Sequence, residues 1–280
     1  MSTRAEVLIG VGELPAAQAA GAQLLDVRWR LGEPHGAGRE RYLAGHLPEA
    51  RFLDLEAVLT GPRTDPTLGR HPLPDADALA AGLEAAGVEV SLPVVVYDEP
   101  GSFAAGRAWW VLRWAGLQVR VLDGGLRAWL DVGGSLETGE PPFPELPTTT
   151  AELVLGQLPT LDADAVADFD GLLIDVRSPE RYRGEVEPID PRAGHIPGAV
   201  NRPVSGFFAG DGTLPGDKEL AELLALPAEG PVAVYCGSGV SATQVLIALT
   251  SLGVDASLYP PSWSGWSADP SRPVAVGSEP

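Results

Sequence analysis

The chain carries the same pattern twice, and this duplication limits its possible folds more than any other feature. The repeated pairs, in chain order, are Leu-Leu-Asp-Val-Arg at 24–28 with Leu-Ile-Asp-Val-Arg at 173–177, Gly-His-Leu-Pro at 45–48 with Gly-His-Ile-Pro at 194–197, and Val-Val-Val-Tyr at 94–97 with Val-Ala-Val-Tyr at 232–235. The first two pairs share an offset of 149 residues, and the third pair follows in the same order. The two halves are therefore predicted to be duplicated domains.

The length of 280 residues also suits two domains. We expect domain 1 at residues 1–137 and domain 2 at residues 151–280. The connecting segment, 138–150, contains four prolines, which fix φ and remove backbone donors and therefore favour an extended linker. Trp109 and Trp110 have no repeat partner, and we expect them to pack at the interface between the domains.

Short apolar runs alternate with helical patterns in each half. Residues 94–97 and 231–235 are β-branched and free of charge, which is typical of buried strands. Amphipathic periodicity predicts helices at 77–86, 218–226 and 241–252. Strands that alternate with helices indicate a parallel sheet flanked by helices, so each half is predicted to be an α/β domain.

The charge balance narrows the range of partners. The chain has 38 acidic and 19 basic residues, a formal net charge of −19, which disfavours nucleic acid and anionic membranes. A site for a small anion must therefore be built locally from arginines and backbone amides. No apolar run is long enough to span a membrane, and a single cysteine permits no internal disulfide. We expect a cytoplasmic monomer that needs no cofactor. We also expect no metal site, because the four histidines lack the spacing of metal ligands.

Cys236 follows the predicted strand 231–235 and precedes Gly-Ser-Gly-Val-Ser, after which a helix begins. Ligands of parallel sheets bind beyond the carboxyl ends of strands, and a glycine-rich loop before a helix can turn its amides toward an anion. Such a loop could stabilise a thiolate or a persulfide. The alternative is that Cys236 is a small residue of the core, as lone cysteines after buried strands commonly are.

Residues 236–242, Cys-Gly-Ser-Gly-Val-Ser-Ala, resemble the active loop of the rhodanese superfamily, specifically of tandem-domain 3-mercaptopyruvate sulfurtransferases. Thiosulfate-specific members carry arginine and lysine where this chain has Gly237 and Ser238, so the resemblance favours a mercaptopyruvate-like donor. The segment 63–74 also resembles domain 1 of bacterial members. Domain 1 has Asp98 in place of the cysteine, so domain 2 is expected to be the catalytic one.

The resemblance also implies roles for further residues. In the family, an arginine four residues after the Asp-x-Arg motif binds the donor, which here is Arg181. The family's second such arginine falls on Asp190, and we expect Arg192 to replace it. Ser238 is expected to relay a proton together with His46, while the acidic member of that relay has no assignment. The backbone of the loop is expected to bind the transferred sulfur, at Gly237, Gly239, Val240 and Ser241.

The resulting prediction is a sulfurtransferase that carries sulfur as a persulfide on Cys236. A small-molecule donor, 3-mercaptopyruvate, would load the cysteine, and a thiol such as reduced thioredoxin, or cyanide, would accept the sulfur. Thiosulfate as donor and a non-enzymatic persulfide carrier remain alternatives. A cysteine phosphatase is disfavoured, because its Cys-x5-Arg loop would need arginine where this chain has Ala242.

Overall fold

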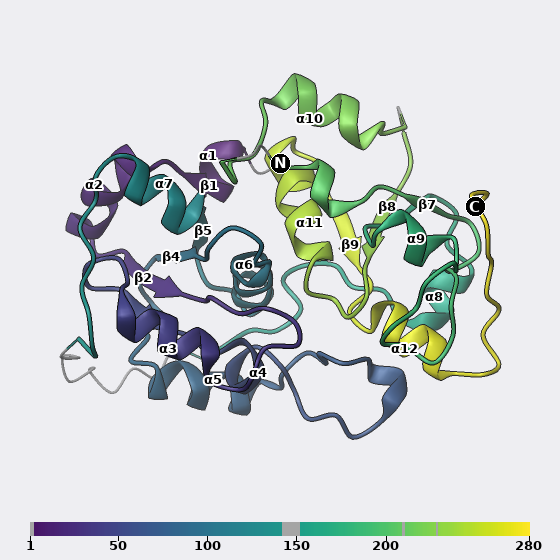
Figure 1. Cartoon of the computed structure of the whole chain (residues 1–280), viewed down its shortest axis with the longest axis horizontal. Helices are drawn as coiled ribbons and strands as arrows, with labels where there is room; N and C mark the ends of the chain where they lie inside the picture. The colour runs from purple at the N-terminus through teal and green to yellow at the C-terminus, as the bar shows by residue number, and fades with distance from the viewer. Residues whose placement is uncertain (1–2, 142–151, 209–210, 228) are drawn as a thin grey trace.

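The computed structural model describes residues 3–141, 152–208, 211–227 and 229–280, and it consists of two α/β units (Figure 1). Each unit is built on one parallel sheet, which confirms the predicted fold class. The predicted linker 138–150 lies mostly outside the described residues, so the exact domain boundaries stay a prediction.

The sheet of domain 1 has the strand order β1-β5-β4-β2-β3. Its strands are β1 (Leu8–Ile9), β2 (Gln23–Asp26), β3 (Arg51–Phe52), β4 (Val94–Tyr97) and β5 (Val119–Leu122). Its helices are α1 (Arg4–Val7), η1 (Val11–Glu13), α2 (Leu14–Ala19), α3 (Ala37–Ala44), α4 (Leu55–Val58), η2 (Pro66–Leu68), α5 (Ala76–Ala85), α6 (Ala104–Trp114) and α7 (Gly125–Asp131). The central strand β4 is buried along its whole length, as its β-branched sequence predicts.

The sheet of domain 2 has the order β7-β6-β8-β9. Its strands are β6 (Leu172–Asp175), β7 (Ala199–Asn201), β8 (Val232–Tyr235) and β9 (Ala256–Leu258). Its helices are α8 (Ala163–Ala167), α9 (Pro179–Tyr182), η3 (Val204–Gly206), α10 (Asp217–Leu224), α11 (Ala242–Ser251) and α12 (Ser262–Ala268). The predicted strands and helices are all present, with ends shifted by one or two residues.

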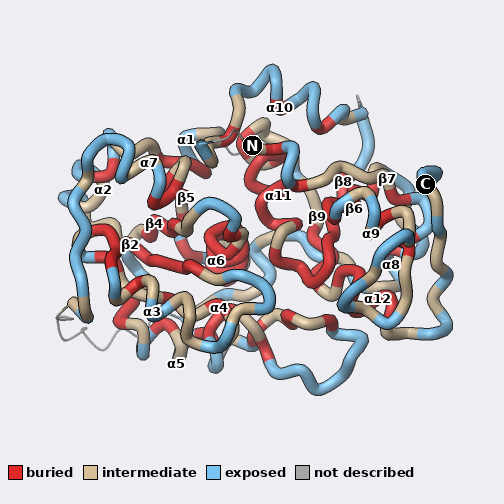
Figure 2. The backbone as a smooth tube through the Cα atoms, viewed as in Figure 1, coloured by how far each residue is buried: buried red, intermediate tan, exposed pale blue. Residues whose placement is uncertain are grey.

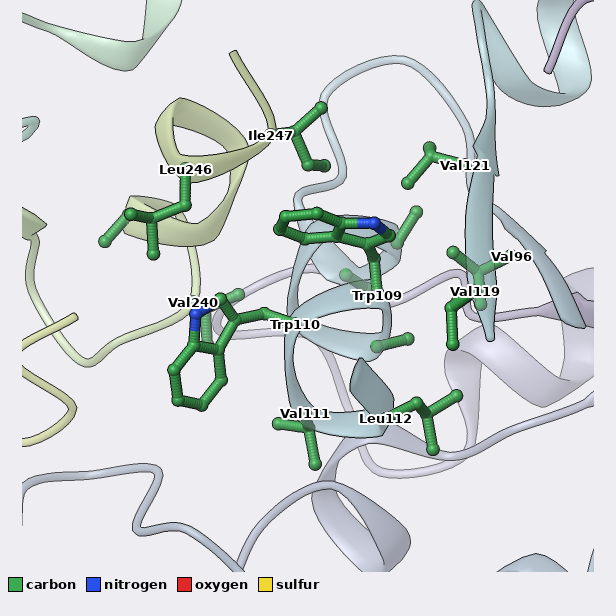
Figure 3. Packing of buried hydrophobic residues seen from close by; sticks show 14 of the residues in the cluster. Val96, Trp109, Trp110, Val111, Leu112, Val119, Val121, Val240, Leu246 and Ile247 are labelled. Carbon is green, nitrogen blue, oxygen red and sulfur yellow. The ribbon is translucent and has the colours of Figure 1, made fainter. Parts of the chain in front are cut away.

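Two buried helices, α6 and α11, form the contact between the domains (Figure 2). Trp109 and Trp110 of α6 lie in one apolar cluster with Leu246 and Ile247 of α11 (Figure 3). Both tryptophans are 1% exposed. The predicted place of this Trp-Trp pair at the domain interface is therefore confirmed. Since a large apolar contact resists hinge motion, the two domains are held in one arrangement.

A second contact comes from the segment between α4 and α5, which extends beneath domain 2 to α12 (Figure 1). Gly69 has φ of 80°, and a Cβ there would lie 2.5 Å from the carbonyl oxygen of Pro261, so only glycine permits this close approach. Next to it, the Arg70 amide donates to Ser264 Oγ at 3.1 Å. Side chains of this domain 1 segment therefore lie at the carboxyl end of the domain 2 sheet.

Candidate active site

Cys236 stands at the carboxyl end of β8, at the start of the glycine-rich loop. The amide of Gly239 donates to Cys236 Sγ at 3.1 Å, and Ser262 Oγ lies 3.9 Å from the same sulfur. Gly239 has φ of 75°, and a Cβ there would be 2.4 Å from the carbonyl oxygen of Pro260. Glycine is therefore required for the turn that aims this amide at the sulfur.

The amino end of α12 holds the glycine-rich loop in place by hydrogen bonds. The amides of Trp263 and Ser264 donate to the carbonyl oxygens of Cys236 and Gly237, both at 2.9 Å. Ser262 Oγ accepts from the Cys236 amide at 3.1 Å. Because the loop is bonded at both its backbone and its sulfur, the position of the thiol is fixed before any substrate arrives.

The thiol lies at the base of a pocket rather than on the surface. Cys236 is 1% exposed, yet it lines a pocket of about 410 Å³ together with residues of both domains. The lining includes Trp29, Arg70 and Phe103 from domain 1, and Arg181, Gly237, Ser238, Val240 and Ser241 from domain 2. A donor must therefore enter the space between the domains to reach the sulfur.

Ser238 begins a chain of polar contacts that runs into domain 1. Its Oγ is 2.8 Å from Nδ1 of His71, and His71 Nε2 is 3.1 Å from Glu56 Oε1. A carboxylate accepts only, so Nε2 carries the proton and Nδ1 accepts from the serine hydroxyl. Burial lowers the pKa of His71 below its ordinary value, although the hydrogen bond to Glu56 opposes that shift. The same hydrogen bond lowers the pKa of Glu56.

The partner of Ser238 is thus His71, and the expectation that His46 joins it was wrong. His46 Nδ1 is bonded to the carbonyl oxygen of Tyr42 at 2.8 Å, and the two rings stack 4.0 Å apart. His195 in domain 2 makes the same two contacts with Tyr182. His46 is a residue of the repeated framework, which explains its place in the duplicated pattern.

Two arginines face the loop, one from each domain. A Cβ placed on Gly237 would lie 3.1 Å from Arg70 Nη2 and 3.4 Å from Arg181 Nη1. The predicted position of Arg181 in the pocket agrees with this geometry. Arg192, by contrast, does not line the pocket. Its Nε and both Nη atoms donate to backbone carbonyl oxygens in and just after α12, those of Trp266, Ser267, Asp269 and Arg272. Arg70 occupies the place expected for Arg192.

Arg107 of α6 connects the two halves of the site from inside. Its guanidinium is fully buried and donates to the carbonyl oxygens of Gly239 at 3.1 Å and His71 at 2.9 Å. Gly239 is the residue whose amide contacts the cysteine sulfur, and His71 is the partner of Ser238. Burial lowers the pKa of Arg107 to about 10, so it stays charged at neutral pH. A single buried cation therefore sets the distance between the sulfur loop and the histidine.

The rhodanese-like domain family matches residues 11–131 and, separately, residues 160–269. The chain belongs to the rhodanese family. The match places Cys236 in the second rhodanese domain and Asp98 in the first.

Individual relatives cover nearly the whole chain. A Mycobacterium tuberculosis protein named "Putative thiosulfate sulfurtransferase SseB" is 47% identical and covers 99% of this chain and 100% of its own. The 3-mercaptopyruvate sulfurtransferase of Escherichia coli is 35% identical over 90% of this chain and 91% of its own. The crystal structure of SseA from Escherichia coli superimposes with a TM-score of 0.79 at 32% identity, covering 91% of this chain and 98% of the other. Like these relatives, the chain is a sulfurtransferase.

Within this rhodanese chain, sequence reasoning missed Glu56, Arg70, His71 and Arg107. A signal was present, because residues 63–74 resemble domain 1 of bacterial sulfurtransferases and include both Arg70 and His71. Among the described residues, no cluster of His, Cys, Asp or Glu could hold a metal ion. None of the described helices is both long and apolar enough to cross a membrane.

Proposed function

We propose that this protein is a 3-mercaptopyruvate sulfurtransferase whose sulfur carrier is Cys236. The observation that carries the proposal is the contact of Ser238 with His71, 2.8 Å long, beside a cysteine whose loop contains no cation. A proton relay is needed when the leaving group is a carbanion, and it has no use when the leaving group is sulfite. The pocket is therefore suited to a donor whose C–S bond is broken.

The first half-reaction balances without an outside proton. The thiolate of Cys236 attacks the sulfur of the donor, the C–S bond breaks, and its electron pair leaves as the enolate of pyruvate. Ser238 and neutral His71 accept the thiol proton of the donor and return it to the methylene carbon of the enolate. Arg70 and Arg181 bind the carboxylate of the donor, and the persulfide remains on Cys236 with the Gly239 amide directed at it.

In the second half-reaction, an acceptor thiol attacks the outer sulfur of the persulfide, and the thiolate of Cys236 leaves. The two steps form a ping-pong cycle. We propose a small dithiol protein such as thioredoxin as the acceptor, a monomeric enzyme, and a cytoplasmic location. The domain limits given above and the sulfur-binding roles of Gly237, Val240 and Ser241 belong to the same proposal.

Mass spectrometry after donor treatment tests the carrier role. We expect one added sulfur on the wild type, located on Cys236, and none on Cys236→Ser. No added sulfur on the wild type with either mercaptopyruvate or thiosulfate would refute the proposal.

Thiosulfate is the second candidate donor, and the specific observation in its favour is the name of the relative that is 47% identical. Steady-state rates with both donors, measured with one acceptor, separate the two. We expect the larger kcat/KM with mercaptopyruvate; the reverse order would make thiosulfate the donor.

A further inference from the structure

Asp190 connects the two arginines of the donor pocket. Its Oδ1 is paired with Nη1 of Arg70, and its Oδ2 accepts from Nη2 of Arg181 at 3.0 Å. Arg70 belongs to domain 1, whereas Asp190 and Arg181 belong to domain 2. The carboxylate of Asp190 therefore joins a cation from each domain at one point.

The ion pairs leave one end of each guanidinium directed at the cysteine loop. Arg70 uses Nη1 for Asp190, while its Nη2 is the atom that a Cβ on Gly237 would meet at 3.1 Å. Arg181 uses Nη2 for Asp190, and its Nη1 is the atom 3.4 Å from the same point. Because Asp190 binds one Nη atom of each guanidinium group, the other Nη atom of each is directed toward the space beside Cys236.

Buried carboxylates also balance the charge of the two arginines. Arg181 donates to Glu187 Oε1 at 2.7 Å as well as to Asp190. The side chains of Asp190 and Glu187 are only 3% and 4% exposed, so solvent screens them poorly. The two carboxylates thus balance the charges of the two arginines that face the loop. Arg30 and Arg177 also line the pocket, and they are paired with Glu99 at 3.0 Å and with Asp175 at 2.6 Å.

We propose that Asp190 is a positioning and specificity-determining residue: it holds Arg70 of domain 1 in the donor pocket and limits the pocket's positive charge to what a donor with one negative charge requires. This inference rests on the proposed function, since it concerns the same donor site. A dianion such as thiosulfate carries one more negative charge than mercaptopyruvate, so it depends more on positive charge that no carboxylate offsets. A monoanion needs only the directed N–H groups of the two arginines.

Asp190→Asn tests the charge effect, because the amide keeps the size of the side chain and removes one negative charge. We expect the ratio of kcat/KM for thiosulfate to kcat/KM for mercaptopyruvate to rise about tenfold, the effect of one unit charge at this range. The matched control is Glu185→Gln, which removes one charge from a surface pair with Arg183 outside the pocket. We expect that ratio to stay within about twofold of the wild type in the control.

A double-mutant cycle adds a readout that does not depend on absolute activity. Arg70→Gln should lower the thiosulfate ratio, and Arg70→Gln with Asp190→Asn should return it toward the wild-type value. An unchanged ratio in Asp190→Asn, with both donors slowed equally, would overturn the inference and leave Asp190 as a structural ion pair. Failure of the proposed function is a separate result, because wild-type protein would then gain no sulfur from either donor.

Discussion

The carboxyl ends of β4 and β8 are equivalent positions in the two domains, and they share one framework. Arg28 donates to Asp26 and to the carbonyl oxygen of Gly45, and Arg177 donates to Asp175 and to that of Gly194. The hydroxyl groups of Tyr97 and Tyr235, the last residues of β4 and β8, each accept from a backbone amide at 3.1 Å. The repeated sequence pattern is the pattern of this framework.

The residues directly after each strand differ between the domains. Asp98 Oδ2 accepts from the Ala105 amide at the start of α6 at 2.9 Å, so its own carboxylate occupies the helix end. The space beside it, about 440 Å³, is lined by no arginine or lysine among the described residues, whereas four arginines line the pocket at Cys236 and two of them, Arg70 and Arg181, face the loop. Residues that repeat between the domains build the scaffold, and residues without a repeat partner provide the chemistry.

Moving the nucleophile is the severest test of this difference. In the double variant Asp98→Cys with Cys236→Ser, we expect complete loss of turnover and no added sulfur at position 98. The reason is that no arginine or lysine lines the space beside position 98 among the described residues, so nothing there would bind the carboxylate of the donor. Peptide mapping by mass spectrometry after donor treatment reads out both sites. Sulfur at position 98 would mean that the scaffold alone suffices.

The two histidines of domain 1 provide the next contrast. We expect His71→Gln to lower kcat with mercaptopyruvate about 100-fold, because the proton relay is lost, and to lower it less than about tenfold with thiosulfate. His46→Gln should leave kcat within about twofold and reduce the free energy of unfolding by about 1 kcal/mol, through its lost contacts with Tyr42. Steady-state kinetics and urea titration measure the two effects. If His46→Gln lowered kcat strongly while its free energy of unfolding stayed at the wild-type value, this division of roles would be contradicted.

The pH profile sharpens the same contrast. Neutral His71 is the proton acceptor, and burial lowers its pKa below the ordinary value of 6.5. Turnover of mercaptopyruvate should therefore fall as the pH drops through that lowered pKa. Stability should begin to fall earlier, near pH 6.5, where the unfolded chain takes up the proton, and should level off below the lowered pKa. Glu56→Gln removes the group that raises the pKa of His71, so the acid limb should move to lower pH. A shift to higher pH would contradict the assigned contact.

The sequence alone predicts what is local or repeated. The strand before Cys236, the loop, the helix after it and the duplicated α/β architecture all follow from patterns over a few residues. Arg181 is found because it has a fixed spacing from the Asp-Val-Arg motif of its own domain. These features depend on neighbours in the chain.

The contacts of the missed residues depend on how the domains meet, so the resemblance of residues 63–74 to bacterial members did not by itself place Arg70 and His71 beside the cysteine loop. Arg70 reaches the pocket and His71 reaches Ser238 because Gly69 lets their segment pack against α12. The motif around His46 favours it as the partner of Ser238, although its repeat partner His195 indicates a framework role. Because the duplication assigns His46 to the framework as well, the unrepeated His71 is the better candidate.

The smallest expected effect concerns Asp98, the domain 1 counterpart of the nucleophile. Burial raises the pKa of Asp98 to about 7, so the folded state binds a proton that the unfolded state, with its ordinary value of 3.8, releases. Its contribution to stability is therefore present at low pH and is lost as the pH rises through about 7. Asp98→Asn should gain about 1 kcal/mol in unfolding free energy relative to wild type between pH 6.5 and pH 8, with Asp77→Asn, at an exposed site on α5, as the matched control. Equal pH profiles for Asp98→Asn and wild type would mean that Asp98 is ionised in the fold, and its place at the end of β4 would then be an anion site like that of Cys236.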